Sequence, residues 1–178
     1  MGDLVEKIIS KIGSDLDPFK KILNFIPGFK GYINRQSRRD ADKLLRETIA
    51  NRFEDQWQRV SEVQRDFISQ GEIAYVDDLE AAAIKLRTFA DRIRRAPRGY
   101  SGLFDAVKIN EDELNKIYQY DAAMLDLSNE VASAIDNVEA SIGTEGLPAS
   151  IRHLKKTAQN CILVFEKRSE VVFSEEVK

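Results

Sequence analysis

The sequence of 178 residues is poor in the side chains that metal centres and nucleophilic active sites use, because it contains one histidine and one cysteine. Di-iron sites of helical bundles need two Glu-x-x-His pairs. Ser150 stands three residues before His153, so not even one such pair exists. His153 and Cys161 would lie about 12 Å apart along a helix, too far for a direct catalytic pair. We therefore expect no catalytic residue, no metal and no cofactor.

Cysteine and long apolar runs are also scarce. A single cysteine excludes a disulfide within the chain, and nothing then requires an oxidising compartment. The longest apolar run outside the first residues, "CILVF", is far below the roughly 20 residues that span a bilayer. Charged residues interrupt the N-terminal segment where a secretory signal would be apolar. We expect a cytoplasmic protein. Alternatively, the protein binds peripherally to the inner face of a membrane.

Glycine and proline are few, at 9 and 4 residues, while 32% of residues are charged and 43% are hydrophobic. This balance is typical of soluble proteins made of long helices. No phosphate-binding glycine loop is present. The "GFKG" at residues 28–31 matches the GxxG of a KH loop, but the sequence offers no strands around it, so hinge glycines are the better interpretation.

What the sequence does contain is apolar spacing of three and four residues, which predicts helices that face a common core. We expect helices over about residues 34–69, 73–95 and 110–143, and a fourth after residue 148, although "CILVF" alone would also suit a strand. In chain order, the four predicted stripes are Leu45, Ile49, Phe53, Trp57, Val60, Gln64, Phe67; Val76, Leu79, Ala83, Leu86, Ala90, Ile93; Leu114, Ile117, Asp121, Met124, Ser128, Val131, Ile135, Val138, Ile142; and Ile151, Leu154, Ala158, Cys161, Phe165, Val172.

These stripes predict an all-α fold, an elongated antiparallel four-helix bundle over residues 34–178 with a short amphipathic helical arm at 1–33. Gly71 and Gly146 mark the expected turns, and Gly143 follows the last residue of the third stripe. The connection between residues 96 and 109 is longer than the roughly 2 to 8 residues usual in bundles. Its apolar residues Tyr100, Leu103 and Phe104 either cap an open end of the core or form a docking loop.

Asp121 and Ser128 place polar groups on the third stripe. A buried polar group usually fixes helix register and must find a hydrogen-bond partner. Arg87 and Lys85 of the preceding helix are candidate partners for Asp121. The alternative is that the stripe is less buried near Asp121.

The arm consists of two amphipathic segments, "GDLVEKIISKIG" and "DPFKKILNFIP". In the second, Asp17 is a candidate N-cap, Pro18 suits the first helical position and Pro27 ends the helix. The first 39 residues carry eight Lys or Arg and four acids, a net charge of +4, which leaves −7 for the rest of the −3 chain. The candidate binding residues of the arm are Leu4, Ile8, Ile12, Phe19, Ile22, Phe25, Ile26, Phe29, Lys7, Lys20, Lys21 and Lys30.

Two interpretations of the arm stay open. Its apolar face inserts into an anionic lipid surface or binds a partner, or it packs on the bundle or on another copy of the chain. The acids Asp3, Glu6, Asp15 and Asp17 weaken the lipid interpretation, and a protein partner tolerates them better.

The pattern thus predicts a non-enzymatic helical scaffold or adaptor, recruited by its arm to a protein assembly or a membrane surface, with a protein partner or self-association expected. An enzyme or metal-binding bundle with a site not visible in the sequence is one alternative. Nucleic-acid binding is another and is not expected. It would use the basic clusters Arg35, Arg38, Arg39 and Arg92, Arg94, Arg95, Arg98, of which the second suits a solvated helix C-terminus.

Overall fold

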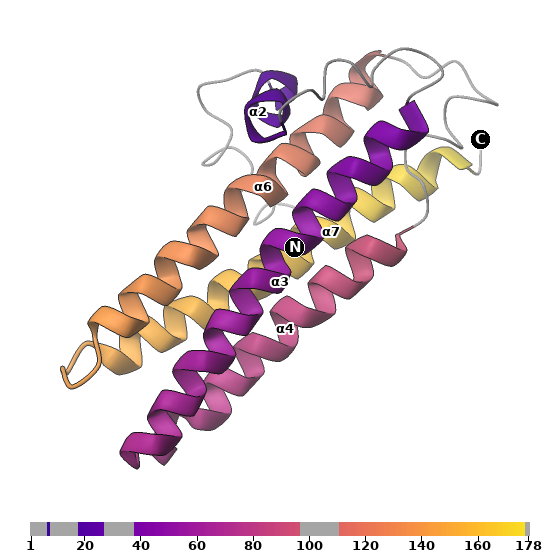
Figure 1. The fold of residues 1–178 in the computed structure, drawn as a ribbon. Coiled ribbons are helices and arrows are strands. Elements are labelled where there is room, and N and C mark those ends of the chain that lie inside the picture. The colour runs from indigo at the N-terminus through magenta and orange to yellow at the C-terminus, as the bar shows by residue number, and fades with distance from the viewer. Residues whose placement is uncertain (1–6, 8–17, 27–37, 97–110, 177–178) are drawn as a thin grey trace.

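The computed structural model describes residues 7, 18–26, 38–96 and 111–176 (Figure 1). All regular structure within these ranges is helical, which confirms the predicted all-α bundle. The elements are α2 (Pro18–Phe25), α3 (Arg38–Gln70), the 3-10 helix η2 (Ile73–Tyr75), α4 (Val76–Arg95), α6 (Glu111–Ala140) and α7 (Leu147–Glu176).

The helix limits agree closely with the apolar spacing. α3 has 33 residues and is therefore about 50 Å long, and α6 and α7 have 30 residues each, which gives an elongated molecule. "CILVF" lies inside α7, because its neighbours on both sides continue the helical stripe. α2 begins at Pro18 and ends before Pro27, as the sequence predicts. Residues 34–37 and residue 110, which the predicted helices include, lie outside the described ranges.

Contacts between side chains define the helix directions. Glu54 of α3 pairs with Arg94 of α4, and Gln64 pairs with Glu80, so one numbering rises as the other falls. The same holds for α6 and α7, where Ser141 contacts Ser150 and Asp121 contacts Arg168. Each of these two helix pairs is therefore an antiparallel hairpin (Figure 1).

The two hairpins lie side by side in the same orientation. Arg52 bonds Asn129 and Arg59 bonds Asp136, a constant separation of 77 positions, so α3 and α6 are parallel neighbours. α4 packs on α7 in the same way. The principal interfaces are thus α3 with α4, α6 with α7, α4 with α7 and α3 with α6, which leaves α4 and α6 diagonally opposed. The connection between Arg95 and Glu111 has to join diagonal helices, which accounts for its length.

The predicted stripes form the core. Phe53 and Phe89 pack with ring centroids 4.3 Å apart, and Phe89 meets Phe165 edge-on at 5.9 Å, so three helices share one aromatic cluster. Most stripe residues are buried, as the sequence predicts. Four stripe residues are only partly buried, namely Trp57, Gln64, Val76 and Ile142, and the side chains of Leu114 and Val172 are outside the description.

Two glycines end helices in the left-handed conformation that other residues avoid. Gly71 has φ of 79°, its N–H donates to the Ile68 carbonyl, and the N–H of Glu72 donates to the Phe67 carbonyl. This is the Schellman arrangement that satisfies the last carbonyls of α3. Gly143 has φ of 76° after α6, whereas Gly146 is not in this region.

Candidate functional site on helix α6

The net negative charge of the protein resides on one helix. α6 carries eight acids and one lysine, a net charge of −7, whereas α3 carries seven residues of each sign. Such an excess within one helix requires cations from elsewhere, because like charges along a helix repel each other. Four of the five α6 acids whose side chains are described form an ion pair with a cation from α7, α2 or α3.

The first of these contacts is a buried ion pair. The Arg168 Nε–H donates to Asp121 Oδ1 at 2.6 Å, and Nη2 lies 3.4 Å from Oδ2. Asp121 is 1% exposed and Arg168 is 2% exposed. Asp121 is therefore fully buried, and the expectation of Arg87 or Lys85 as its partner is wrong. Both belong to α4, which is diagonal to α6 and packs on α3 and α7.

Ser128, the second polar residue of the α6 stripe, is satisfied within its own helix. Its hydroxyl donates to the Leu125 carbonyl at 2.6 Å and the residue is buried. It thus fills a core position without an unsatisfied donor. Arg87 is exposed and stacks over the Trp57 ring at 5.6 Å.

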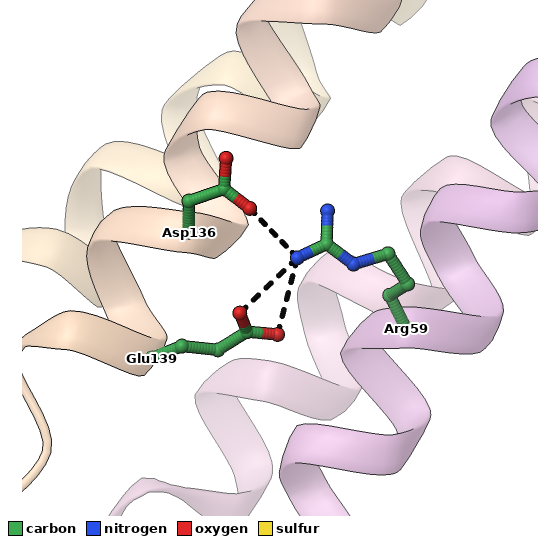
Figure 2. Close-up of polar contacts among 3 residues, drawn as sticks. All are labelled: Arg59, Asp136 and Glu139. Carbon is green, nitrogen blue, oxygen red and sulfur yellow. Dashed lines mark hydrogen bonds and ion pairs between the residues drawn. The ribbon is translucent and has the colours of Figure 1, made fainter.

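The second contact joins the two hairpins. One nitrogen of Arg59, on α3, lies 2.7 Å from Asp136 and 3.1 Å from Glu139, both on α6 (Figure 2). The hydrogen bond to Asp136 raises the pKa of the Arg59 guanidinium, and the nearby Glu139 carboxylate acts in the same direction. All three side chains keep contact with solvent, so this clamp adds little stability.

The third contact holds α2 on α6. The Lys21 ammonium lies 2.6 Å from Asp126, and both side chains are more than four-fifths buried. Figure 1 shows α2 end-on beside the N-terminal half of α6, so its axis crosses the bundle instead of extending it. A short crossing helix covers only a few turns of α6.

Apolar packing and a cation–π contact reinforce this ion pair. Ile22 is 0% exposed and Ile26 is 5% exposed, and both belong to the same core as the bundle. The Arg52 guanidinium of α3 lies 4.7 Å from the centroid of the Phe25 ring. Phe25 thus packs against the core and also contacts a cation of α3.

The pattern of buried residues along α6 differs between the part near α2 and the part beyond it. From Asp121 to Ser128 every residue except the half-buried Asp126 is buried, including those on the side away from the core, Ala122 and Ala123. One or two turns later the same side is exposed, at Asn129, Glu130 and Ser133. The small alanines leave room for a helix to approach closely. We name the residues Ala122, Ala123 and Asp126 the α2 face of α6.

Of the predicted binding residues, those in α2 are thus divided between the interior and the surface. Ile22 and the adjoining Ile26 are buried in the protein itself, Lys21 pairs with Asp126, and Lys20 is exposed. Lys7, which precedes α2 in the chain, is exposed as well. The backbone of Phe19 belongs to α2, but its side chain is not described. Outside the described ranges lie Leu4, Ile8, Ile12, Phe29 and Lys30, as well as the loop residues Tyr100, Leu103 and Phe104.

The C-terminal arginines of α4 are not simply solvated. Arg92 pairs with Glu166 of α7 at 3.1 Å, and Arg94 donates to Glu54 and Asn51 of α3. The hydrogen bond from Arg94 lowers the pKa of Glu54, although partial burial opposes the shift. Arg95 is exposed, Arg35 and Arg98 lie outside the described ranges, and the side chains of Arg38 and Arg39 are not described.

His153 and Cys161 have the separate surroundings that their spacing predicts. His153 is exposed, whereas Cys161 is completely buried and its thiol lies 3.2 Å from the Thr157 carbonyl. Burial raises the pKa of the Cys161 thiol far above its ordinary value, so this group is not an activated nucleophile. In the described part of the chain, no three His, Cys, Asp or Glu residues gather as metal ligands. Nor does any helix there have the length and apolar character needed to cross a membrane.

Comparison with protein-family models, with curated proteins and with solved structures gave no match for this chain.

Sequence reasoning missed two buried arginines. The predicted α7 stripe passes from Phe165 to Val172 and omits Arg168, although that position follows Phe165 by three residues and lies on the stripe. A gap of seven in a three-four pattern was the signal. Arg46, next to Leu45, donates to the carbonyls of Arg94 and Ala96 and so caps the C-terminus of α4.

Proposed function

We propose that this protein is a non-enzymatic helical scaffold or adaptor, recruited to a protein assembly or a membrane surface through its N-terminal arm. The observation that supports the proposal best is the burial of Ile22 and Ile26 on the bundle. These side chains cannot bind a partner while they occupy the core, so the arm has two parts. α2 is the anchor, and the amphipathic segment 2–13 is the recruiting element.

This division suits an adaptor. Residues 14–17 alone separate the recruiting element from α2. A docked α2 therefore keeps the recruiting element close to α6. Any partner that this element binds is then held near the long bundle. The apolar residues Leu4, Ile8 and Ile12 would insert into a groove of a partner or into a lipid surface, with Lys7 on the opposite side of the predicted helix.

The proposal is tested with the double substitution Ile8→Glu and Ile12→Glu, which removes the apolar face of the recruiting element and leaves the bundle intact. A chain that starts at Asn34 is a poorer test, because it also removes α2, whose Ile22 is part of the core. The matched control is Ile22→Glu, which disturbs the anchor.

Two readouts are compared in full-length protein. One is flotation with vesicles of phosphatidylcholine and phosphatidylserine, and the other is the distribution of a fluorescent fusion in cells of the source organism. The double variant is expected to lose localisation or flotation at unchanged melting temperature, whereas Ile22→Glu lowers the melting temperature. A double variant that distributes and floats like the wild type would refute recruitment by this segment.

A further inference from the structure

α2 packs mainly on α6, and Arg52 of α3 contacts its Phe25 ring. α6 is the principal neighbour of α2, and the four interfaces between the long helices do not involve α2. What α2 recognises is therefore the α2 face of α6 together with Arg52, and all of it is also present on a second copy of the chain. An eight-residue helix is too short to be stable alone in water, so α2 needs such a surface to form.

The α2 face of α6 in turn needs a helix that covers it. Ala122 and Ala123 are buried within one turn of Asp126, the residue through which α6 pairs with α2. Without α2, Asp126 would lose the Lys21 ammonium at 2.6 Å, within a helix that carries a net charge of −7. Charge and shape thus make this surface specific for a short basic amphipathic helix, and this chain carries one.

We propose that α2 is exchangeable, so that α2 of one copy binds the α2 face of α6 on a second copy and the protein self-associates when its copies are concentrated. The inference deepens the proposed function and rests on it only for what brings the copies together. Exchange of an identical element between protomers preserves its contacts, and this makes it a low-cost route to dimers. Residues 27–37, with Pro27, Gly28 and Gly31, connect α2 to α3 and span up to about 36 Å when extended.

The protein concentration at which exchange occurs is set by competition, because each α6 can bind either its own α2 or that of another copy. A tethered segment is present at an effective concentration on the order of 1 mM near its site. Dilute protein therefore keeps α2 on its own α6. Recruitment to an assembly raises the local concentration toward this range, and exchange then links neighbouring copies.

Charge reversal at the Lys21–Asp126 pair tests exchange directly. In a Lys21→Asp chain two carboxylates oppose each other within the molecule, and in an Asp126→Lys chain two ammonium groups do so. When the two chains are mixed, each α2 meets an opposite charge only on the α6 of the other chain. Reciprocal exchange satisfies both contacts at once.

The mass in solution is measured by light scattering at about 100 μM, below the effective concentration given above. We expect the equimolar mixture to reach twice the 20.3 kDa of one chain, with a dimer fraction about tenfold above that of either variant alone. The chain that carries both substitutions restores the pair internally and is expected to be monomeric, like the wild type.

A mixture that stays at the mass of one chain, from variants that keep their helical circular dichroism, would overturn the proposal. Equal dimerisation of either variant alone would overturn it as well, because another surface would then be responsible. Neither outcome would contradict the proposed recruitment by the N-terminal arm, because the substitutions at residues 8 and 12 test that proposal separately. If the charge variants lose their fold, a Lys21→Cys chain is mixed with an Asp126→Cys chain and treated with a bismaleimide. A product of doubled mass supports exchange, and its absence at millimolar concentration refutes it.

Discussion

At the scale of single residues, the contact between Asp121 and Arg168 joins two charged side chains that are almost fully buried. Both charges are withdrawn from water, so each depends on the partner groups around it. Such pairs contribute less to net stability than to the choice of one register, because a shifted helix would leave a charge buried without its partner. The register hypothesis for Asp121 is thus supported by its burial and by a partner on the adjacent helix.

We expect Asp121→Ala or Arg168→Ala to lower the free energy of unfolding by about 3 to 5 kcal/mol, because each removes the ion-pair partner of a buried charge. The double substitution Asp121→Ala with Arg168→Ala should cost less than the sum of the two single changes. Urea unfolding of all four proteins measures this coupling. Strict additivity would show that the two residues act independently.

Glu54 gives a residue-level prediction for pH. Its pKa is lowered in the folded state by the hydrogen bond from Arg94, so it binds protons less readily than in the unfolded chain, where the ordinary value is 4.5. The stabilisation is therefore fully present above pH 4.5 and is lost as the pH falls through the folded pKa.

The difference in unfolding free energy between the wild type and Glu54→Gln should accordingly shrink as the pH is lowered below 4.5. Because the pair is partly exposed, we expect this difference in unfolding free energy to be less than about 1 kcal/mol at neutral pH. Thermal unfolding from pH 7 to pH 3 measures it, with Glu62→Gln as a control on an exposed carboxylate of the same helix. A constant difference across this range would contradict the assignment.

At the scale of elements, the ends of the helices depend on backbone conformation. Gly71 adopts φ of 79° and nothing lies within 4 Å of the position where a Cβ would stand. The cost of a side chain there is therefore conformational and not steric. Gly146 terminates the next turn without a positive φ, and its Cβ would approach Thr144 Oγ1 at 3.4 Å.

We expect Gly71→Ala to destabilise the protein by about 1 to 2 kcal/mol, the cost of the left-handed conformation for an L-residue. Gly146→Ala is the matched control and should have a smaller effect. Chemical denaturation of both variants distinguishes them. Equal costs would mean that the turn after α3 changes its conformation to accept alanine.

The stripe of an element indicates which of its faces is buried but not which element covers it. Phe53, Leu86 and Ile135 lie in the core as the spacing predicts. The second buried side of α6, at Ala122 and Ala123, carries no comparable signal, because alanine suits both surface and interior of a helix. Their burial is seen only in the tertiary structure, where α2 packs on α6 and pairs with the nearby Asp126.

At the scale of the whole molecule, two hairpins meet through charged contacts at both edges of a shared apolar core. Arg59 contacts Asp136 and Glu139 on one edge, and Lys155 and Arg92 contact Asp78 and Glu166 on the other. These pairs are largely open to solvent and are therefore screened by salt.

Arg59→Gln should consequently destabilise the protein by less than about 1 kcal/mol, and the effect should diminish at high salt. Unfolding midpoints at low salt and at about 1 M sodium chloride, where the Debye length is about 3 Å, measure it. The exposed Arg65→Gln is the control on the same helix. A loss of several kcal/mol would mean that the clamp determines hairpin association.

The sequence by itself determined the all-α class, the core stripes, the turn at Gly71 and the limits of α2, because these follow from side-chain periodicity and local backbone preferences. The arrangement of the hairpins, the pairing of Asp121 with Arg168 and the docking of α2 on α6 were decided by the tertiary structure. The physical reason is that a helical pattern specifies an angle around one axis. Which partner occupies that angle depends on how all the long helices pack together.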